Sequence, residues 1–67
     1  MLAKNKLRAK IIEVGYSQSD VADEIGISKT AFSNKINDKC DFTLTEIQKI
    51  CNLLNLNEEE RHTIFLF

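Results

Sequence analysis

The sequence contains no proline and no tryptophan, and only two of its 67 residues are glycine. Proline interrupts the backbone hydrogen bonds of a helix, so its absence leaves the helices that we predict uninterrupted. The chain also has no apolar run approaching the roughly 20 residues that a membrane span needs. Its first residues do not form the apolar segment of a signal peptide. We therefore expect a cytoplasmic protein that does not enter the membrane.

Cysteine and histidine are too few to form the usual metal sites. Cys40 and Cys51 lie eleven positions apart, and His62 is the only histidine. This spacing matches neither a zinc-ligand set nor a disulfide framework, so we expect no metal and no cofactor. Cys51 falls on an apolar helical stripe and is expected in the core. Cys40 is expected to be a reduced loop thiol, and His62 a surface residue.

Catalytic motifs are missing as well. The four serines have no nearby pair of histidine and carboxylate, and Ser17 and Ser28 are expected to cap helices. Three consecutive glutamates at positions 58–60 point in different directions on a helix, which favours a solvated first turn over a cation site. No glycine-rich phosphate loop is present. We expect no enzymatic activity.

Composition indicates one folded domain over residues 1–67, with 43% hydrophobic and 28% charged residues. The net charge is only −1, but its distribution is uneven. Residues 1–36 carry six basic and four acidic side chains, whereas residues 37–67 carry three basic and six acidic ones. A local positive face is sufficient to neutralise phosphates. The balance nevertheless argues against strong non-specific binding to DNA.

Periodicity and capping signals predict an all-α fold of five short helices, with no strand. The third helix follows Ser28, and the other predicted starts combine a cap with an acidic residue three positions later. These pairs are Ser17/Asp20, Thr43/Glu46 and Asn57/Glu60. The expected helices run over about 3–14, from 17 to 25, from 28 to about 37, from 43 onward, and from 57 to about 65. Their apolar faces include Leu7, Ile11 and Val14 in the first helix, and Leu44, Ile47, Cys51 and Leu54 in the fourth.

The segment from Gln18 to Ile36 has the spacing of a helix-turn-helix. Ala22 supplies a small side chain where two steeply crossed helices would meet. Gly26 follows four positions later, where a tight turn requires positive φ, and Ser28 can cap the next helix. The apolar residues left to hold this pair against a core are Val21, Ile25, Ile27, Phe32 and Ile36.

The outer face of the third helix follows from a rotation of about 100° per residue. With Phe32 pointing inward, Thr30, Ser33, Asn34 and Asn37 point outward, and Lys29 flanks them. Asparagine can pair with adenine, lysine donates to guanine, and serine or threonine suits several bases. An ordinary solvated face is the alternative, but such faces favour Glu, Lys, Gln and Arg because of their helix propensity. The composition therefore favours base recognition.

Residues 7–56 resemble the helix-turn-helix domain of lambda-type phage repressors and Cro proteins. Within that family the resemblance is closest to small Cro-like proteins of Gram-positive phages and prophages. The segments that carry it are L-R-A-K-I-I-E (7–13), the Gln18/Ala22/Gly26 spacing, G-I-S-K-T-A-F-S-N-K-I-N (26–37) and F-T-L-T-E-I-Q-K-I-C-N-L-L-N-L (42–56). Together they cover about three quarters of the chain.

The resemblance implies a five-helix lambda-repressor-like domain that regulates transcription by binding a double-stranded DNA operator. Its third helix would enter the major groove, and a homodimer would bind paired half-sites. By this resemblance the base-reading residues are Lys29, Thr30, Ser33 and Asn34, and Gln18 contacts phosphate and braces the first of them. We expect further phosphate contacts from Ser17, Asn37 and Lys39. Many relatives have a glycine after the third helix, where this chain has Asn37-Asp38-Lys39.

A homodimer needs an apolar surface away from the third helix. The residues that we predict for this interface are Leu53, Ile64, Phe65, Leu66 and Phe67. The alternative is that Ile64 and Phe65 complete the core of the monomer. A second functional class also remains open, because the acidic pI of about 5.7 and the apolar C-terminal residues suit a module that binds another phage repressor.

Overall fold

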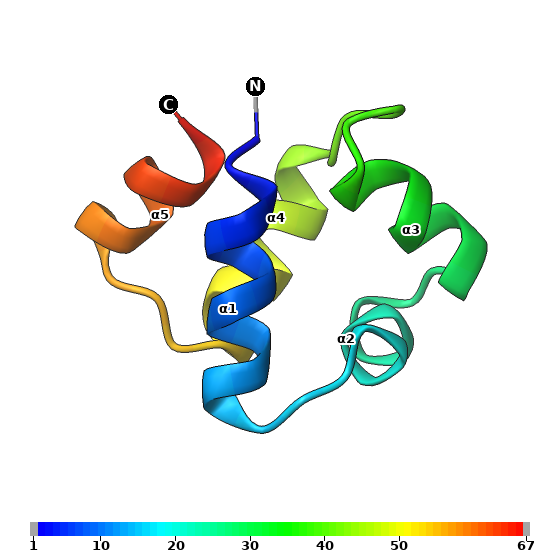
Figure 1. Cartoon of the computed structure of the whole chain (residues 1–67), viewed down its shortest axis with the longest axis horizontal. Helices are drawn as coiled ribbons and strands as arrows, with labels where there is room; N and C mark the ends of the chain where they lie inside the picture. Colours follow the sequence, from blue (N-terminus) through cyan, green and yellow to red (C-terminus); the bar gives the residue numbers. More distant parts are fainter. Residues whose placement is uncertain (1, 67) are drawn as a thin grey trace.

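In the computed structural model, which describes residues 2–66, the chain forms five α-helices and no β-strand (Figure 1). This confirms the predicted all-α class. The helices are α1 (Lys4–Val14), α2 (Gln18–Ile25), α3 (Lys29–Ile36), α4 (Leu44–Leu53) and α5 (Glu58–Phe65). In this part of the chain, no helix has the length and apolarity needed to cross a membrane.

The helix ends follow the capping signals of the sequence. All three predicted capping boxes form, so side chain and backbone bond reciprocally at the first turns of α2, α4 and α5. Ser28 caps α3 by accepting the backbone N–H of Ala31 at 3.0 Å. Gly15 and Gly26 end α1 and α2 with left-handed φ values of 96° and 83°. Local sequence therefore sets the boundaries of these helices.

The helices are arranged with α3 and α5 on opposite sides of the molecule. In Figure 1, α2 and α3 lie on one side of α1, and α5 lies on the other side. α2 packs against α1, α3 and α4, so it is the central support of α3. The consequence is that one broad side of α3 is left without a covering helix.

The core differs from the predicted stripes at α1 and α4. Leu44 is 63% exposed, and Ile50 is fully buried in its place. Ile47, Ile50 and Leu54 share one face of α4, and this face is buried. The predicted face, which included Leu44, is therefore not the one that packs against the core. Val14, the last residue of α1, is exposed as well. The core consists of Leu7, Ile11, Val21, Ala22, Ile25, Phe32, Ile36, Ile47, Ile50, Leu54, Ile64 and Phe65.

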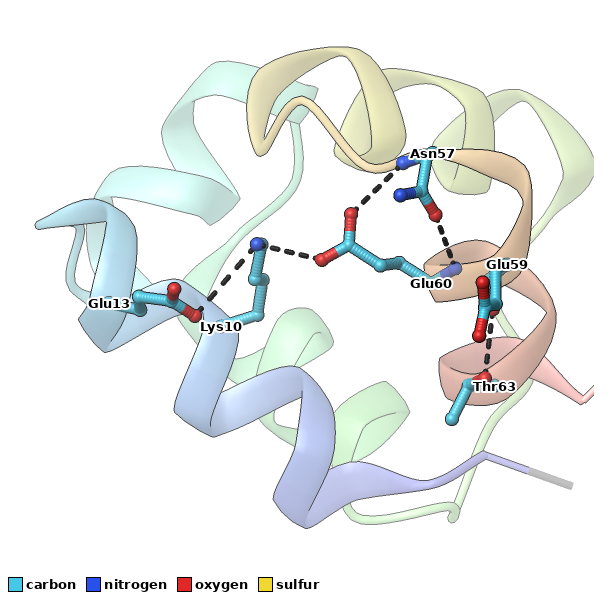
Figure 2. Close-up of polar contacts among 6 residues, drawn as sticks. All are labelled: Lys10, Glu13, Asn57, Glu59, Glu60 and Thr63. Atoms are coloured by element: carbon cyan, nitrogen blue, oxygen red, sulfur yellow. Dashed lines mark hydrogen bonds and ion pairs between the residues drawn. The ribbon is translucent and has the colours of Figure 1, made fainter.

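A polar contact fixes α5 to α1. The Lys10 ammonium lies 2.8 Å from a carboxylate oxygen of Glu60 and 3.8 Å from one of Glu13 (Figure 2). The other Glu60 oxygen accepts the backbone N–H of Asn57, so one side chain joins the two helices and caps α5. The hydrogen bond from Lys10 lowers the pKa of Glu60. At the chain ends, the backbone N–H of Ala3 donates to the Ile64 carbonyl at 2.8 Å.

Ala22 of α2 is fully buried, so Ala22→Leu is expected to destabilise the fold. Extra carbon atoms in a packed core cost about 1–3 kcal/mol of unfolding free energy. Chemical denaturation followed by circular dichroism measures this loss without DNA. Ala9→Leu makes the same change at an exposed position of α1 and is expected to have little effect. Equal stability of both variants would contradict the close packing of α2.

Candidate nucleic-acid interface

A tight turn at Gly26 sets the direction of α3 relative to α2. The backbone N–H groups of Gly26 and Ile27 both donate to the Ala22 carbonyl, at 3.0 Å in each case. The left-handed φ of Gly26 allows these two bonds and reverses the chain within a few residues. Since the side chain of Ala22 is small, α3 can pack directly against α2. The turn therefore joins two packed helices and brings the second of them to the surface.

α3 divides into an inward and an outward face, as the helical rotation predicted. Phe32 is 1% exposed, and Ile36 is fully buried. Lys29, Thr30 and Ser33 are exposed on the other side, with Asn34 half-buried beside them. Among residues 2–66, the side chains of Lys29, Thr30 and Asn34 make no hydrogen bond. The structure thus places all four residues proposed to read bases on one side of a single helix.

Ser17 and Gln18, two residues predicted to contact phosphate, lie at the start of α2. Gln18 is exposed. The Ser17 hydroxyl accepts the backbone N–H of Asp20 at 3.1 Å, so its first role is to cap the helix. The backbone N–H of Ser17 in turn donates to the Asp20 carboxylate and lowers its pKa. An anion approaching this helix start would therefore meet an ionised carboxylate, and Gln18 is the better placed donor.

Lys39, the predicted phosphate-binding residue after α3, lies in a loop that folds back on the helix. The backbone N–H groups of Lys39 and Cys40 donate to the Asn34 carbonyl, at 2.9 and 3.3 Å. Asp38 has a left-handed φ of 66° at the bend that follows α3. These bonds hold the backbone of the loop against α3 and leave the Lys39 side chain exposed.

Asn37, the fourth residue predicted to contact phosphate, is half-buried and already engaged within the protein. Its carbonyl oxygen Oδ1 accepts a hydrogen bond from Arg8 Nη2 at 2.8 Å, and its amide Nδ2 donates to the Ser33 carbonyl at 2.8 Å. The contact with Arg8 was not predicted. The two residues are 29 positions apart, and neither belongs to an apolar stripe or a capping motif that would suggest a pairing.

Of the three lysines between positions 29 and 39, one is committed to the fold. Lys35 pairs with Glu46 of α4, and both side chains are largely buried. Burial acts to raise the pKa of Glu46, but hydrogen bonds from Lys35 and from the Thr43 backbone lower it overall. The pair joins the C-terminal end of α3 to the start of α4. Lys29 and Lys39 remain as the exposed cations at the two ends of the helix.

The predicted dimer interface is partly wrong. Ile64 and Phe65 are 4% and 6% exposed, because they close the core beneath α5. They are therefore not available as a surface, and the alternative that they complete the monomer is correct. Leu53 is half-buried against the core, while Leu66 is 48% exposed. Phe67 lies outside the described residues.

The cysteines and the acidic first turn of α5 form no metal site within residues 2–66, where no group of three or more His, Cys, Asp or Glu side chains could hold an ion. Cys40 is a free, exposed cysteine in the loop after α3, where the sequence predicted a loop thiol. Cys51 is only half-buried beside the core, and this burial raises the pKa of its thiol. The outward face of α3 is therefore the strongest candidate site.

The fold defines a small all-α domain with a helix pair that presents one polar face. The sequence belongs to the family described as "Protein of unknown function (DUF739)", and the match covers residues 3–67. A search of curated proteins found no significant match. Membership in this family does not assign a function.

Proposed function

We propose that the protein is a sequence-specific regulator of transcription that binds double-stranded DNA through α3. The observation that carries this proposal is the outward face of α3. Lys29, Thr30, Ser33 and Asn34 share that face, while Phe32 and Ile36 fix the opposite face in the core. The major groove of DNA is about 12 Å wide and admits an α-helix, and these side-chain types can donate to or accept from base edges there.

The helix pair resembles the helix-turn-helix of lambda-type repressors and Cro proteins, which supports the same proposal. In such a motif the first helix lies across the DNA backbone while the second enters the groove. Gln18, at the start of α2, and Lys39, after the end of α3, are exposed donors, and we assign the phosphate contacts to them. Phosphate contacts orient a protein on DNA, whereas contacts to bases provide specificity.

We further propose that the protein acts as a homodimer in the cytoplasm. One helix with four reading side chains cannot distinguish a single half-site among the ~10⁶ or more competing sites in a genome. Two copies about 34 Å apart on the DNA would double the recognised sequence. Of the described residues that the sequence predicted for this contact, Leu66 and the partly buried Leu53 remain candidates.

Selection of DNA from a pool of random duplexes tests the proposed function. We expect enrichment of a short motif, with a twofold-related copy if the protein binds as a dimer. If no sequence is enriched over a control selection without protein, the proposal fails. Binding to another phage repressor is then the second candidate. The observation that favours this alternative is the apolar surface left exposed at Ile12 and Leu44.

Once a motif is selected, Thr30→Ala and Asn34→Ala are each expected to weaken binding to it by about 1–3 kcal/mol. Binding to random DNA should hardly change, because these side chains are proposed to contact bases. Titrations of both DNAs by fluorescence anisotropy measure the difference. Asn52→Ala removes the same amide from an exposed position of α4 and is the matched control.

Phosphate contacts are expected to behave differently in the same titrations. Lys39→Ala and Gln18→Ala should weaken binding to selected and random DNA alike, because they lose contacts without sequence information. Lys39→Ala should also reduce the slope of log affinity against log salt by about 1. If all four variants reduced binding to both DNAs equally, α3 would not be the element that reads the sequence.

A further inference from the structure

Arg8 connects α1 to the end of α3 through one hydrogen bond. Its Nη2 donates to Asn37 Oδ1 at 2.8 Å, in a partly buried position. Asn37 is the C-cap residue directly after the last residue of α3. A cation next to the C-terminus of a helix is favourable, because the last carbonyl groups carry partial negative charge. The contact therefore joins a helix of the core to the last turn of α3.

Asn37 extends this contact to Ser33, one of the proposed reading residues. Its Nδ2 donates to the Ser33 carbonyl at 2.8 Å and lies 3.4 Å from the Ser33 hydroxyl oxygen. A continuous series of hydrogen bonds thus leads from Arg8 through the Asn37 amide to the backbone of Ser33. Because both ends of the amide are engaged, Asn37 is better suited to hold α3 than to bind phosphate.

One atom of the Arg8 side chain offsets part of the stability that this contact provides. Its Nε is buried and has no hydrogen-bond partner among residues 2–66. A buried donor without a partner loses its hydration and gains nothing in return. An apolar side chain of similar length at this half-buried position would not carry that cost. The contact is therefore better explained by the geometry that it imposes on α3 than by its contribution to stability.

We propose that Arg8 is a positioning residue for DNA recognition, acting through Asn37 on the last turn of α3. This inference rests on the proposed function. Reading side chains must be held to within about 0.5 Å of their working positions, and supporting residues behind them provide that precision. Phe32 and Ile36 fix how α3 is packed, and Arg8 fixes the turn that carries Ser33.

Arg8→Met tests the proposal, with Arg61→Met as the matched control. Arg61 is an exposed arginine of α5, so its loss removes the same charge far from α3. We expect Arg8→Met to reduce the ratio of selected to random DNA affinity about tenfold, the scale of one base contact. Its affinity for random DNA should fall no further than that of Arg61→Met. Its melting temperature should be equal to or above that of the wild type.

Asn37→Ala provides an independent measurement on the same contact. If Arg8 acts through Asn37, the double variant Arg8→Met/Asn37→Ala should lose no more discrimination than Arg8→Met alone. Additive losses would show that the two residues act separately and would overturn the proposal. A fall in random-DNA affinity beyond that of Arg61→Met would also overturn it, because Arg8 would then contact phosphate directly.

Hydrogen exchange of the free protein separates this inference from the proposed function. In Arg8→Met, the amides of residues 33–37 should exchange faster than in the wild type, while those of α2 remain unchanged. If the wild type selects no DNA, the proposed function fails and this measurement still decides whether Arg8 orders α3. Unchanged exchange would overturn the positioning role. A large drop in melting temperature with exchange raised throughout the chain would do the same, because Arg8 would then be a residue of general stability.

Discussion

Phe32→Ala is expected to lower the free energy of unfolding by about 3–5 kcal/mol, the usual cost of removing a buried phenylalanine side chain. Phe32 is 1% exposed, and its ring lies 5.8 Å from that of Phe42 in an edge-to-face arrangement. Proteins have a free energy of unfolding of about 0.05–0.15 kcal/mol per residue, so the total for a domain of this size is small. The loss expected for this variant is therefore a large part of the total free energy of unfolding.

Chemical denaturation at constant temperature is the measurement for this variant, with Phe32→Leu as the control. Leucine keeps much of the buried volume, so Phe32→Leu should lose clearly less unfolding free energy than Phe32→Ala. Because α3 provides Phe32, the alanine variant is also expected to lose DNA binding through unfolding. A Phe32→Ala protein as stable as the wild type would mean that the inward face of α3 is assigned incorrectly.

Phe65→Ala is the second large effect, and it is also expected to cost about 3–5 kcal/mol of unfolding free energy. Phe65 is 6% exposed, and its ring meets that of Phe42 at 90° with the centroids 6.0 Å apart. Phe42 therefore contacts both Phe32 and Phe65, so the loss of either ring leaves it poorly packed. Removing residues 65–67 altogether should unfold the protein rather than produce a folded monomer.

Leu66→Ala is the matched test of the proposed homodimer, because Leu66 follows Phe65 but is exposed. We expect this variant to melt close to the wild-type temperature. If Leu66 belongs to the interface, sedimentation should show a shift toward monomer while the helical content stays constant. A Phe65→Ala protein that is fully folded and monomeric would restore Phe65 to the interface and contradict its place in the core.

Local signals in the sequence predicted the ends of the helices well. Each capping box joins residues three positions apart, such as Thr43 and Glu46, so its formation depends on one turn of chain. The role of Gly26 could be predicted equally well, because the left-handed φ after the end of a helix favours glycine. The two faces of α3 followed from the same short-range periodicity, since Phe32 and Ile36 are its only large apolar residues.

Features that depend on contacts between helices could not be predicted in the same way. In α4, leucine and isoleucine occur on two overlapping faces, and only packing against the other helices decides that Ile50 is buried and Leu44 exposed. From the sequence, Ile64 and Phe65 could equally have packed against a second copy of the chain or into the core of the same chain. The pairing of Arg8 with Asn37 required knowing that the first turns of α1 pass the end of α3.

The separation of the two faces of α3 has a consequence for how such a protein can evolve. Substitutions at exposed positions usually change stability by no more than about 0.5 kcal/mol. Under the proposed function, the exposed Lys29 and Thr30 of the first turn can therefore vary to follow a changing operator while the fold stays intact. The last turn has no such freedom, because Ser33 is held through Asn37 by a residue of α1. New specificities should therefore arise first through the N-terminal half of the helix.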